Sequence, residues 1–256
     1  MTAGTSSSTT RRVLLIGESW VVSGTHIKGV DVFQQPRYEE GGQELVEALE
    51  SSGAEVTRVP AHLACLDVPA SVEAMSAYDV VILSDVGADS LELTDDCMRG
   101  ERSVSRLRVL AEWVAQGGSL LMVGGYMSFS GFQGRARYSR SPLRAVLPVE
   151  LLPYDDRVER PEGVAPEVVD PSHEITAGLD ASWPYVLGYN QFRAKADAST
   201  LVVVDDDPLL VVGTHERGRV AAYATDCSPH WASRDFLAWG DYAPFFCALV
   251  DWLGDA

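Results

Sequence analysis

The sequence predicts an α/β protein: a three-layer sandwich around a central, mostly parallel sheet, to which the C-terminal third adds antiparallel strands. The first observation is the apolar run 120–123, which lies between two glycine pairs and is typical of a strand buried on both faces of a parallel sheet. The second is the helical spacing of apolar residues at 104–116, directly before that run. The third is a series of β-rich runs near the end of the chain, separated by tight-turn residues.

The first half of the chain supplies the other parallel strands. Apolar runs at 12–17, 55–59 and 78–85 each predict a buried strand, and residues 43–52 have the spacing of a short amphipathic helix. The connection 18–42 is expected to be a long loop. Connections of this length are uncommon in α/β units and are often functional.

The second half changes character after the run 120–123. Residues 142–167 are rich in proline and lack a regular period, so an irregular excursion is expected there, and a turn with a short helix is expected at 172–179. Strands at 201–204, 209–213 and 219–225 follow one another through tight turns and must be antiparallel. An amphipathic helix at 242–253 closes the chain.

The domain organisation follows from the absence of repeats and linkers in the sequence. Residues 1–10 are rich in serine and threonine and are expected to form a disordered tail. Residues 11–256 are expected to form a single domain, which is compatible with the chain length of 256.

Composition excludes several classes of partner. The net charge of −17 disfavours binding to nucleic acid or to an anionic membrane surface, both of which attract basic proteins. No apolar run approaches the roughly 18 residues of a membrane span. The four cysteines are widely separated and lack zinc-site or disulfide-scaffold spacing, so we expect reduced thiols, a cytoplasmic protein and no metal.

One basic cluster departs from the acidic composition. Four arginines occur within ten residues after the run 120–123, and they could hold an anionic ligand or pair with the protein's own carboxylates. Pairing is the more common arrangement and is our expectation. The four are Arg135, Arg137, Arg140 and Arg144.

Polar and aromatic residues follow the predicted parallel strands at the point where each strand ends. In an open α/β sheet, ligands bind in the crevice beyond these carboxyl ends. We therefore expect one patch there, with two more residues reaching it from the connection 18–42. The strand exits supply Glu18, Trp20, Asp85, Gly125, Tyr126 and His230, and the connection supplies Tyr38 and Glu39.

Aromatic residues at strand exits and loop starts add to this expectation. Core aromatics usually lie within the periodic apolar runs, whereas Trp20, Tyr126, Tyr189 and Trp231 do not. Aromatic walls combined with carboxylates suit a small polar or cationic ligand.

The motifs that carry these residues resemble a known family. Together they are similar to the class I glutamine amidotransferase-like superfamily, and specifically to a bacterial family of glutamine amidotransferase-like cytoplasmic proteins related to trehalose-utilisation-type domains. The resemblance implies a flavodoxin-like sandwich and covers nearly the whole chain. The motifs are Gly17-Glu18-Ser19-Trp20, Tyr38-Glu39-Glu40-Gly41-Gly42, Leu83-Ser84-Asp85-Val86-Gly87, Gly124-Gly125-Tyr126-Met127-Ser128-Phe129, Leu152-Pro153-Tyr154-Asp155-Asp156-Arg157 and Thr225-Asp226-Cys227-Ser228-Pro229-His230-Trp231.

The resemblance also implies where a glutaminase would keep its nucleophile. Working members of the superfamily place a cysteine on a strained turn after the strand, followed by a histidine and a glutamate late in the chain. Here Gly124 occupies the cysteine position, and the late strand is followed by Asp226, Cys227 and His230. Glycine has no side chain to attack an amide. The sequence therefore predicts the fold without the glutaminase reaction.

Two hypotheses of different class remain. The first is a binding protein that retains the crevice without its nucleophile, with Gly124, Gly125, Asp226 and Trp231 among the ligand-binding residues. The second is a hydrolase or amidotransferase relative, in which Cys227 and His230 form a thiolate–imidazole pair or, with Asp226, a metal site. Ser128 and Ser130 could replace the nucleophile only with a histidine base in reach. The sequence does not identify the ligand or a cofactor, and a homo-oligomer is possible.

Overall fold

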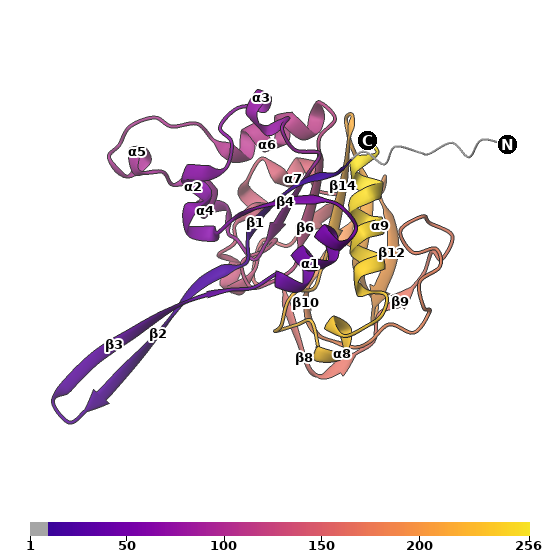
Figure 1. Cartoon of the computed structure of the whole chain (residues 1–256). Coiled ribbons are helices and arrows are strands. Elements are labelled where there is room, and N and C mark those ends of the chain that lie inside the picture. Colours follow the sequence, from indigo (N-terminus) through magenta and orange to yellow (C-terminus); the bar gives the residue numbers. More distant parts are fainter. Residues whose placement is uncertain (1–9) are drawn as a thin grey trace.

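The computed structural model describes residues 10–256 and is built around an eight-stranded sheet (Figure 1). The strand order is β4-β1-β5-β6-β14-β13-β12-β9. The predicted tail, residues 1–10, lies outside the described residues except for Thr10. The sheet is formed by β1 (Arg12–Gly17), β4 (Glu55–Val59), β5 (Val80–Ser84), β6 (Ser119–Val123), β9 (Glu167–Val168), β12 (Ser199–Val204), β13 (Asp207–His215) and β14 (Gly218–Tyr223).

The sheet has a parallel half and an antiparallel half, as predicted. Strands β4, β1, β5, β6 and β14 run parallel, whereas β13, β12 and β9 each run antiparallel to the preceding neighbour. Strand β14 belongs to both halves because it pairs parallel to β6 and antiparallel to β13. The α/β class and the mixed sheet are confirmed.

Helices cover the two faces of the sheet. Helix α9 packs on α1 and on β5, β6 and β14, and α6 lies on the other face beside α3, α4 and α7 (Figure 1). Within residues 10–256, none of the helices is both long and apolar enough to cross a membrane. The α-helices are α1 (Gln43–Ser51), α2 (Ala64–Asp67), α3 (Val72–Met75), α4 (Ala88–Glu92), α5 (Asp95–Met98), α6 (Arg106–Ala115), α7 (Leu143–Val146), α8 (Arg234–Leu237) and α9 (Tyr242–Gly254).

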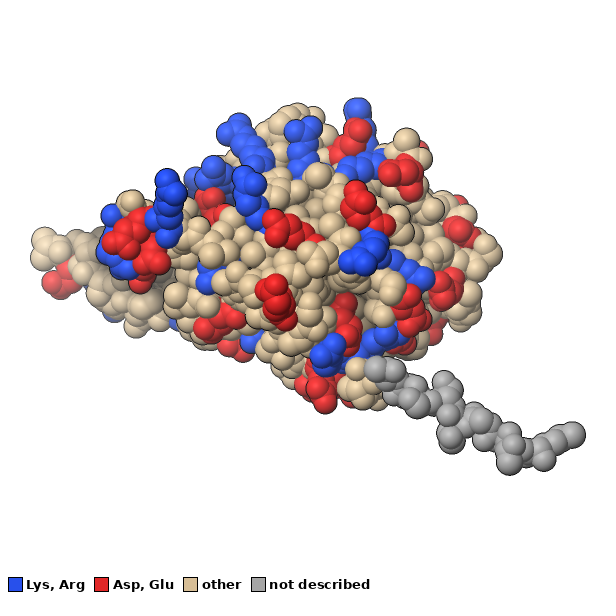
Figure 2. Space-filling view, turned by 90° about the horizontal axis from the view of Figure 1, so that it is seen from above, with Lys and Arg blue, Asp and Glu red and all other residues tan. Residues whose placement is uncertain are grey.

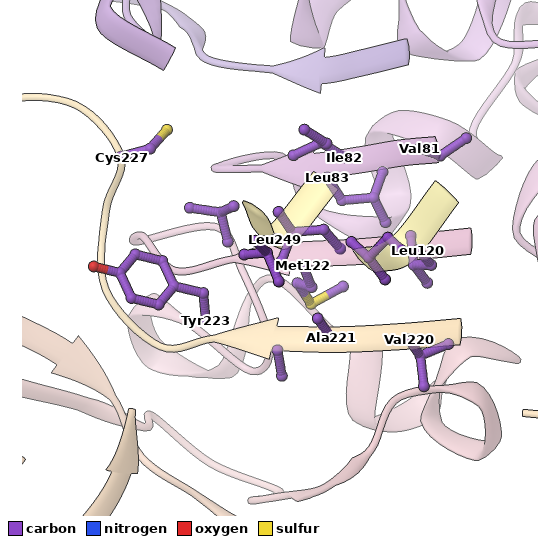
Figure 3. Close-up of a cluster of buried hydrophobic side chains, with 14 of the residues drawn as sticks. Val81, Ile82, Leu83, Leu120, Met122, Val220, Ala221, Tyr223, Cys227 and Leu249 are labelled. Atoms are coloured by element: carbon purple, nitrogen blue, oxygen red, sulfur yellow. The ribbon is translucent and has the colours of Figure 1, made fainter. Parts of the chain in front are cut away.

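The central strands are buried because their side chains meet helices on both faces. Every residue of β5 and β6 is buried, which explains why their sequences are continuous apolar runs instead of alternating ones. Figure 3 shows part of this core, where Leu249 of α9 lies beside Met122 and Leu120 of β6. Burial of such side chains supplies the main stabilisation of the fold.

The register of the parallel strands brings their carboxyl ends into one row. Gly17 is paired with Ser84, Ser84 with Val123, and Val123 with Tyr223. The residues that follow these four leave the sheet at the same level. The predicted site residues Glu18 and Asp85 directly follow two of these paired residues and are therefore neighbours in space. Ser84, which precedes Asp85, donates a hydrogen bond to Glu18 across 66 positions of sequence.

The expected long loop at 18–42 is instead mostly a hairpin, and this prediction was wrong. Strands β2 (Ser19–Lys28) and β3 (Asp31–Glu40) pair along ten residues each and project from the body (Figure 1). The connecting turn has Gly29 at φ 65°, which suits the two-residue hairpin turn whose first central residue is glycine. The alternation expected of a half-buried strand is absent because neither face is buried.

Two further expectations were also wrong. Residues 142–167 contain regular structure, namely α7, β7 (Val149–Leu151) and the whole of β8 (Arg157–Val164). Strand β7 pairs with β11 (Phe192–Ala194), and β8 pairs with β10 (Val186–Asn190). Residues 172–179 form turns without a helix. Short strands outside the main sheet leave little periodic signal, and Pro161 lies within β8.

Candidate functional site

A pocket of about 310 Å³ opens at the row of strand carboxyl ends. It combines acidic groups with an aromatic wall, and it contains no lysine or arginine among the residues that line it. The volume lies at the lower end of the range for small-molecule sites, roughly 300–1,000 Å³. The lining residues are Glu18, Trp20, Asp85, Tyr126, Asp226, Ser228, Pro229 and His230.

Three of the lining residues have unusual backbone conformations. Glu18 has φ 49°, Asp85 has φ 43° and His230 has φ 151°, all in the region that side chains disfavour. Glu18 and Asp85 are the first residues after β1 and β5, so in each case the left-handed residue stands where the chain leaves the sheet. Such strained positions cluster at functional sites.

Glu18 is buried at the floor of the pocket. Its two carboxylate oxygens accept hydrogen bonds of 2.5 Å from the hydroxyls of Ser84 and Ser228. Burial, followed by the charge of Asp226, raises the pKa of Glu18 above its usual value despite these hydrogen bonds. The carboxyl is thus held in one orientation while its charged form is disfavoured.

Asp85 and Asp226 lie on either side of Gly125. A Cβ atom at Gly125 would lie 2.8 Å from Asp85 Oδ1 and 3.0 Å from Asp226 Oδ1, so the two carboxyls fill the space beside this glycine. Burial is the largest cause that raises the pKa of each to about 6, and nearby carboxyls add to it. The backbone N–H of Met127 donates to Asp85 Oδ1 at 2.7 Å.

His230 forms a pair with Asp226 instead of with Cys227. Its Nδ1 lies 2.9 Å from Asp226 Oδ2, which also accepts the backbone N–H of Trp231 at 3.0 Å. When Asp226 is ionised it can only accept, so Nδ1 then carries a proton and Nε2 is the basic atom of the neutral imidazole. Burial lowers the pKa of His230, but the hydrogen bond and charge of Asp226 outweigh it and leave the pKa raised.

The aromatic wall is held by a second set of polar contacts. The ring of Tyr126 meets His230 edge-on at 4.6 Å between centroids, and the Arg157 guanidinium lies 4.6 Å over the same ring. Glu159 accepts hydrogen bonds from the Tyr126 hydroxyl at 2.9 Å and from Trp231 Nε1 at 3.0 Å. The exposed face of the wall is therefore fixed before a ligand arrives.

The backbone around Gly124 leaves no room for a side chain. A Cβ atom there would lie 2.1 Å from the carbonyl oxygen of Ala224 and 2.8 Å from the nitrogen of Thr225. Real Cβ atoms do not approach backbone so closely, so a cysteine at this position requires β6 and β14 to separate. Gly124 is buried and does not line the pocket.

Cys227 is not placed as a nucleophile, which corrects the predicted thiolate–imidazole pair. Its side chain is fully buried beside the core (Figure 3), with Sγ 3.6 Å from Ser84 Oγ and 3.8 Å from Glu18 Oε1. Burial, followed by the charge of Glu18, raises the pKa of the thiol well above its usual value. A protonated thiol without access to the pocket does not attack a substrate.

Several predicted residues lie outside the lining. Trp231 is buried behind Tyr126, Glu39 accepts a hydrogen bond of 3.0 Å from Trp20 Nε1, and Tyr38 packs edge-on against His62. Tyr189 is buried and donates its hydroxyl to Asp207. Of the four aromatics predicted to face a ligand, only Trp20 and Tyr126 line the pocket.

The serines after β6 and one arginine of the basic cluster have structural contacts, whereas no ion pair is found among the described residues for Arg135, Arg140 or Arg144. Ser128 Oγ accepts the backbone N–H of Asp85, and the Ser130 hydroxyl donates to the carbonyl of Leu152, so neither faces His230. Arg137 forms an ion pair with Asp89 at 2.7 Å. None of the four arginines lines the pocket.

Sequence reasoning missed Ser228, Pro229 and Glu159. Ser228 and Pro229 lie in the same exit segment as Asp226 and His230, so the row of strand ends could have indicated them. Glu159 lies in β8, within the stretch 142–167 for which the sequence predicts irregular structure, and no signal in the sequence indicates it. Among residues 10–256, no group of three or more His, Cys, Asp and Glu side chains is arranged to hold a metal ion.

Comparison with known proteins identifies the family of this chain. Residues 12–255 match the family model described as "Putative glutamine amidotransferase". Two solved structures are similar over nearly their whole length: Cytoplasmic Protein STM3548 from Salmonella typhimurium, with 38% identity over 94% of this chain and 98% of that one, and Cytoplasmic Protein STM1381 from Salmonella typhimurium LT2, with 40% identity over 94% and 99%. Each has a TM-score of 0.91.

A more distant likeness concerns the fold alone. A structure titled a thua-like protein from Parabacteroides merdae aligns with a TM-score of 0.56 at 13% identity, over 96% of this chain and 90% of that one. No curated protein matches the sequence. The family model covers almost all of the described residues, and the chain therefore belongs to the glutamine amidotransferase-like family that this model describes.

Proposed function

We propose that the pocket at the strand ends binds a small polar molecule that carries a cationic, amine-type group, and that the protein does not hydrolyse glutamine. The observation that carries this proposal is the presence of three carboxyl groups, Glu18, Asp85 and Asp226, in one pocket without a lining lysine or arginine. A cationic group between them relieves their mutual repulsion.

The aromatic wall supports the same ligand chemistry. Trp20 and Tyr126 present ring surfaces to the pocket, and a cation over such a face is attracted by the ring quadrupole. The hydrogen bonds of Glu159 and Glu39 keep both rings in place. A rigid, partly aromatic wall lowers the entropic cost of binding.

Binding of a cation should release protons from the pocket. Asp85 and Asp226 each have a pKa of about 6, and a positive charge beside a carboxyl lowers its pKa. Below pH 6 both groups are mostly protonated, so the ligand must displace protons in order to bind. Affinity for an amine should therefore rise as the pH is raised from 5 to about 7.

The test compares amines with hydroxyl compounds of matched shape. Calorimetric titration of the whole chain with 1,4-diaminobutane and glucosamine is set against 1,4-butanediol and glucose. We expect binding of at least one amine, with heats that depend on the buffer because protons are released. Asp85→Asn should weaken binding of the amine about tenfold or more, as expected for a lost charged contact. The control Asp235→Asn, at an exposed position of α8, should leave the affinity unchanged. Equal binding of the hydroxyl compounds would contradict the cationic ligand.

The second half of the proposal concerns glutamine. Gly124 supplies no nucleophile and has no space for one, and Cys227 is buried in its protonated form. Purified protein should release ammonia from glutamine only at background rate, because losing the nucleophile of such a site removes several powers of ten in rate. Turnover that Cys227→Ala abolishes would place the nucleophile at Cys227.

One observation favours a second candidate, acid–base chemistry on the bound molecule. The Asp226–His230 pair leaves Nε2 basic, and the His230 side chain is 43% exposed at the pocket. Such a pair can accept or donate a proton in a hydrolase or related enzyme. For any compound that the wild type converts, His230→Gln should stop turnover while leaving binding within a few-fold. Unchanged turnover in this variant would exclude His230 as the base.

The location of the protein is part of the proposal. Two relatives are named cytoplasmic proteins, and the four cysteines of this chain are free thiols. Thiols that are not paired suit a reducing compartment. We therefore place the protein in the cytoplasm.

A further inference from the structure

The hairpin of β2 and β3 is an exposed arm that contacts the body near its base, where Ser19 Oγ accepts the Ala61 N–H and Tyr38 packs against His62. Ten cross-strand pairs run from Ser19 and Glu40 at its base to Lys28 and Asp31 at its tip, and the arm points away from the sheet (Figure 1). Beyond the base, the side chains of both strands are exposed on both faces. An isolated two-stranded hairpin is at best marginally stable in water, so a persistent arm of this length needs a surface to lie on.

The arm carries apolar side chains that are unusual for a solvent-exposed segment. Ile27 is 72% exposed and lies opposite Val32, which is 63% exposed. Phe33 stacks on His26 with 4.8 Å between ring centroids, and the Lys28 ammonium lies 5.7 Å from the centroid of the Phe33 ring. Ile27 and Val32 lie on one face of the arm and Phe33 on the other, because neighbouring residues of a strand point to opposite faces. Exposed large apolar side chains on both faces indicate an interaction site. The exposed apolar residues of the arm are Trp20, Val21, Val22, Ile27, Val30, Val32, Phe33 and Tyr38.

The charge of the arm differs from that of the chain. Residues 21–37 contain one lysine, one arginine and one aspartate, whereas the chain as a whole has a net charge of −17. In Figure 2 the left-hand end, which is the arm, is mostly tan, and acidic and basic side chains gather beside it. Two copies of an acidic protein repel each other, so they can approach best through a segment that lacks this excess of negative charge.

A matching surface lies on the body at the same side of the molecule. Leu66 of α2, Leu93 after α4, Met98 of α5 and Val104 before α6 are all about half exposed or more. They are held together by Arg106, which donates to the carbonyls of Leu66 and Val68, and by Glu92, which accepts from Ser105 and Leu107. We call these four apolar residues the α4–α5 patch.

The surroundings of this patch are acidic. Asp89 and Asp96 are paired with Arg137 and Arg99, whereas no ion pair with a lysine or arginine is found among the described residues for the other four carboxylates of these segments, Asp67, Glu92, Asp95 and Glu101. Lys28 at the arm tip has no carboxylate within ion-pair distance among the described residues, so it is available to this surface. Apolar contacts would supply the affinity, and the charges the orientation.

From these two surfaces we infer that the protein forms a twofold dimer in which the arm of each copy lies on the α4–α5 patch of the other. Arm and patch lie on the same side of the body (Figure 1), as reciprocal exchange requires, and a twofold axis then closes the assembly with every contact made twice. Pro36 in β3 lacks an N–H to offer to an added strand, so contact through the faces of the arm is favoured over extension of its edge. Of the pocket residues only Trp20 belongs to the arm, at its base, and the contact proposed here is tested at Ile27 and Val32, which lie near the tip.

The first test is the mass of the whole chain in solution, measured by sedimentation velocity over a range of concentrations. The wild type should be a dimer at micromolar concentration. An arm variant with Ile27→Glu and Val32→Glu, and a patch variant with Leu66→Glu and Met98→Glu, should each be monomeric. A control variant, Val169→Glu, changes an exposed apolar residue outside both surfaces and should remain dimeric.

Mixing the two monomeric variants distinguishes contact of arm with patch from contact of arm with arm. A mixed pair regains one intact contact, namely the arm of the patch variant on the patch of the arm variant, so heterodimers should appear, with weaker affinity than the wild type. Failure of the mixture to associate would overturn the assignment of the patch.

Other results would overturn the inference as a whole. A wild type that is monomeric at about 100 µM, where even weak complexes associate, would mean that the arm serves a different partner. A dimer that survives both arm substitutions would show that the copies meet elsewhere. Circular dichroism of each variant confirms that it is folded, which is expected because all four changed side chains are exposed.

Discussion

The central sheet and the hairpin arm are both built from β-strands, yet the side chains of the central strands are buried and those of the arm are exposed. In β5 and β6 every side chain is buried, and helices cover both faces. In β2 and β3 almost every side chain is exposed, and only cross-strand pairs hold the strands together. The body can therefore impose unusual backbone conformations on its strand ends, whereas the arm can do so only at its turn. The site was built where the surroundings are rigid enough to hold it.

The largest effect that would test this contrast is expected at Gly124. Gly124→Ala should destabilise the protein by about 4 kcal/mol or more, because the added methyl group meets the backbone of Ala224 in a packed core. Urea unfolding measures the loss. Gly240→Ala, where a Cβ meets nothing within 4 Å, is the control and should change stability by less than about 1 kcal/mol. A mild effect at Gly124 would show that β6 and β14 separate easily.

A pair of truncations compares the two regions directly. Leu121→Ala in β6 should cost about 2–5 kcal/mol, since it leaves a cavity between sheet and helices. Ile27→Ala in the arm should cost less than about 0.5 kcal/mol in the monomer, because the side chain is already in water. Both values come from urea unfolding at a concentration below that of association. A large loss at Ile27 would mean that the arm packs on its own body.

The buried carboxyls of the pocket should make stability depend on pH. The pKa of Asp85 is raised from 3.8 to about 6, so the folded state binds more protons than the unfolded state between these values, and stability falls as the pH rises through this window. One such group contributes a slope of at most about 1.4 kcal/mol per pH unit. Asp85→Asn retains an acceptor for the Met127 N–H and should remove this contribution. Unfolding of variant and wild type at pH 4 to 7 measures the difference, and identical pH profiles would contradict the raised pKa.

The smallest effect is expected at the turn of the arm. Gly29→Ala places a side chain at φ 65°, which costs roughly 1 kcal/mol. Because the arm can open without unfolding the body, hydrogen exchange of residues 19–40 should accelerate while exchange in β5 and β6 stays unchanged. Coupled acceleration in the sheet would show that the arm and the body unfold together.

The sequence predicted the body well and the arm not at all, for a physical reason. Burial on both faces forces continuous apolar runs such as 120–123, and such runs are visible without a structure. The arm has no face that is buried against its own body, so apolar residues do not recur with a regular period in residues 19–40. Within the site, the rule of strand exits predicted one patch, and five of its residues line the pocket whereas Gly125 does not; the five are Glu18, Trp20, Asp85, Tyr126 and His230. It did not show that Cys227 points into the core, because that depends on side-chain direction within one turn.

The close approach of Ala224 to Gly124 has a consequence for the history of the family. A glycine in an otherwise usable elbow could be replaced by cysteine in a single mutational step, and an idle relative could regain amide chemistry. Here the residue that follows β14 occupies the volume that the thiol would need, since a Cβ at Gly124 would lie 2.1 Å from the carbonyl oxygen of Ala224. Any descendant that recovered the nucleophile would first have to pass through variants with a displaced β14 and an impaired core. On the function proposed above, a cysteine restored at this position would therefore cost stability before any chemistry could be gained.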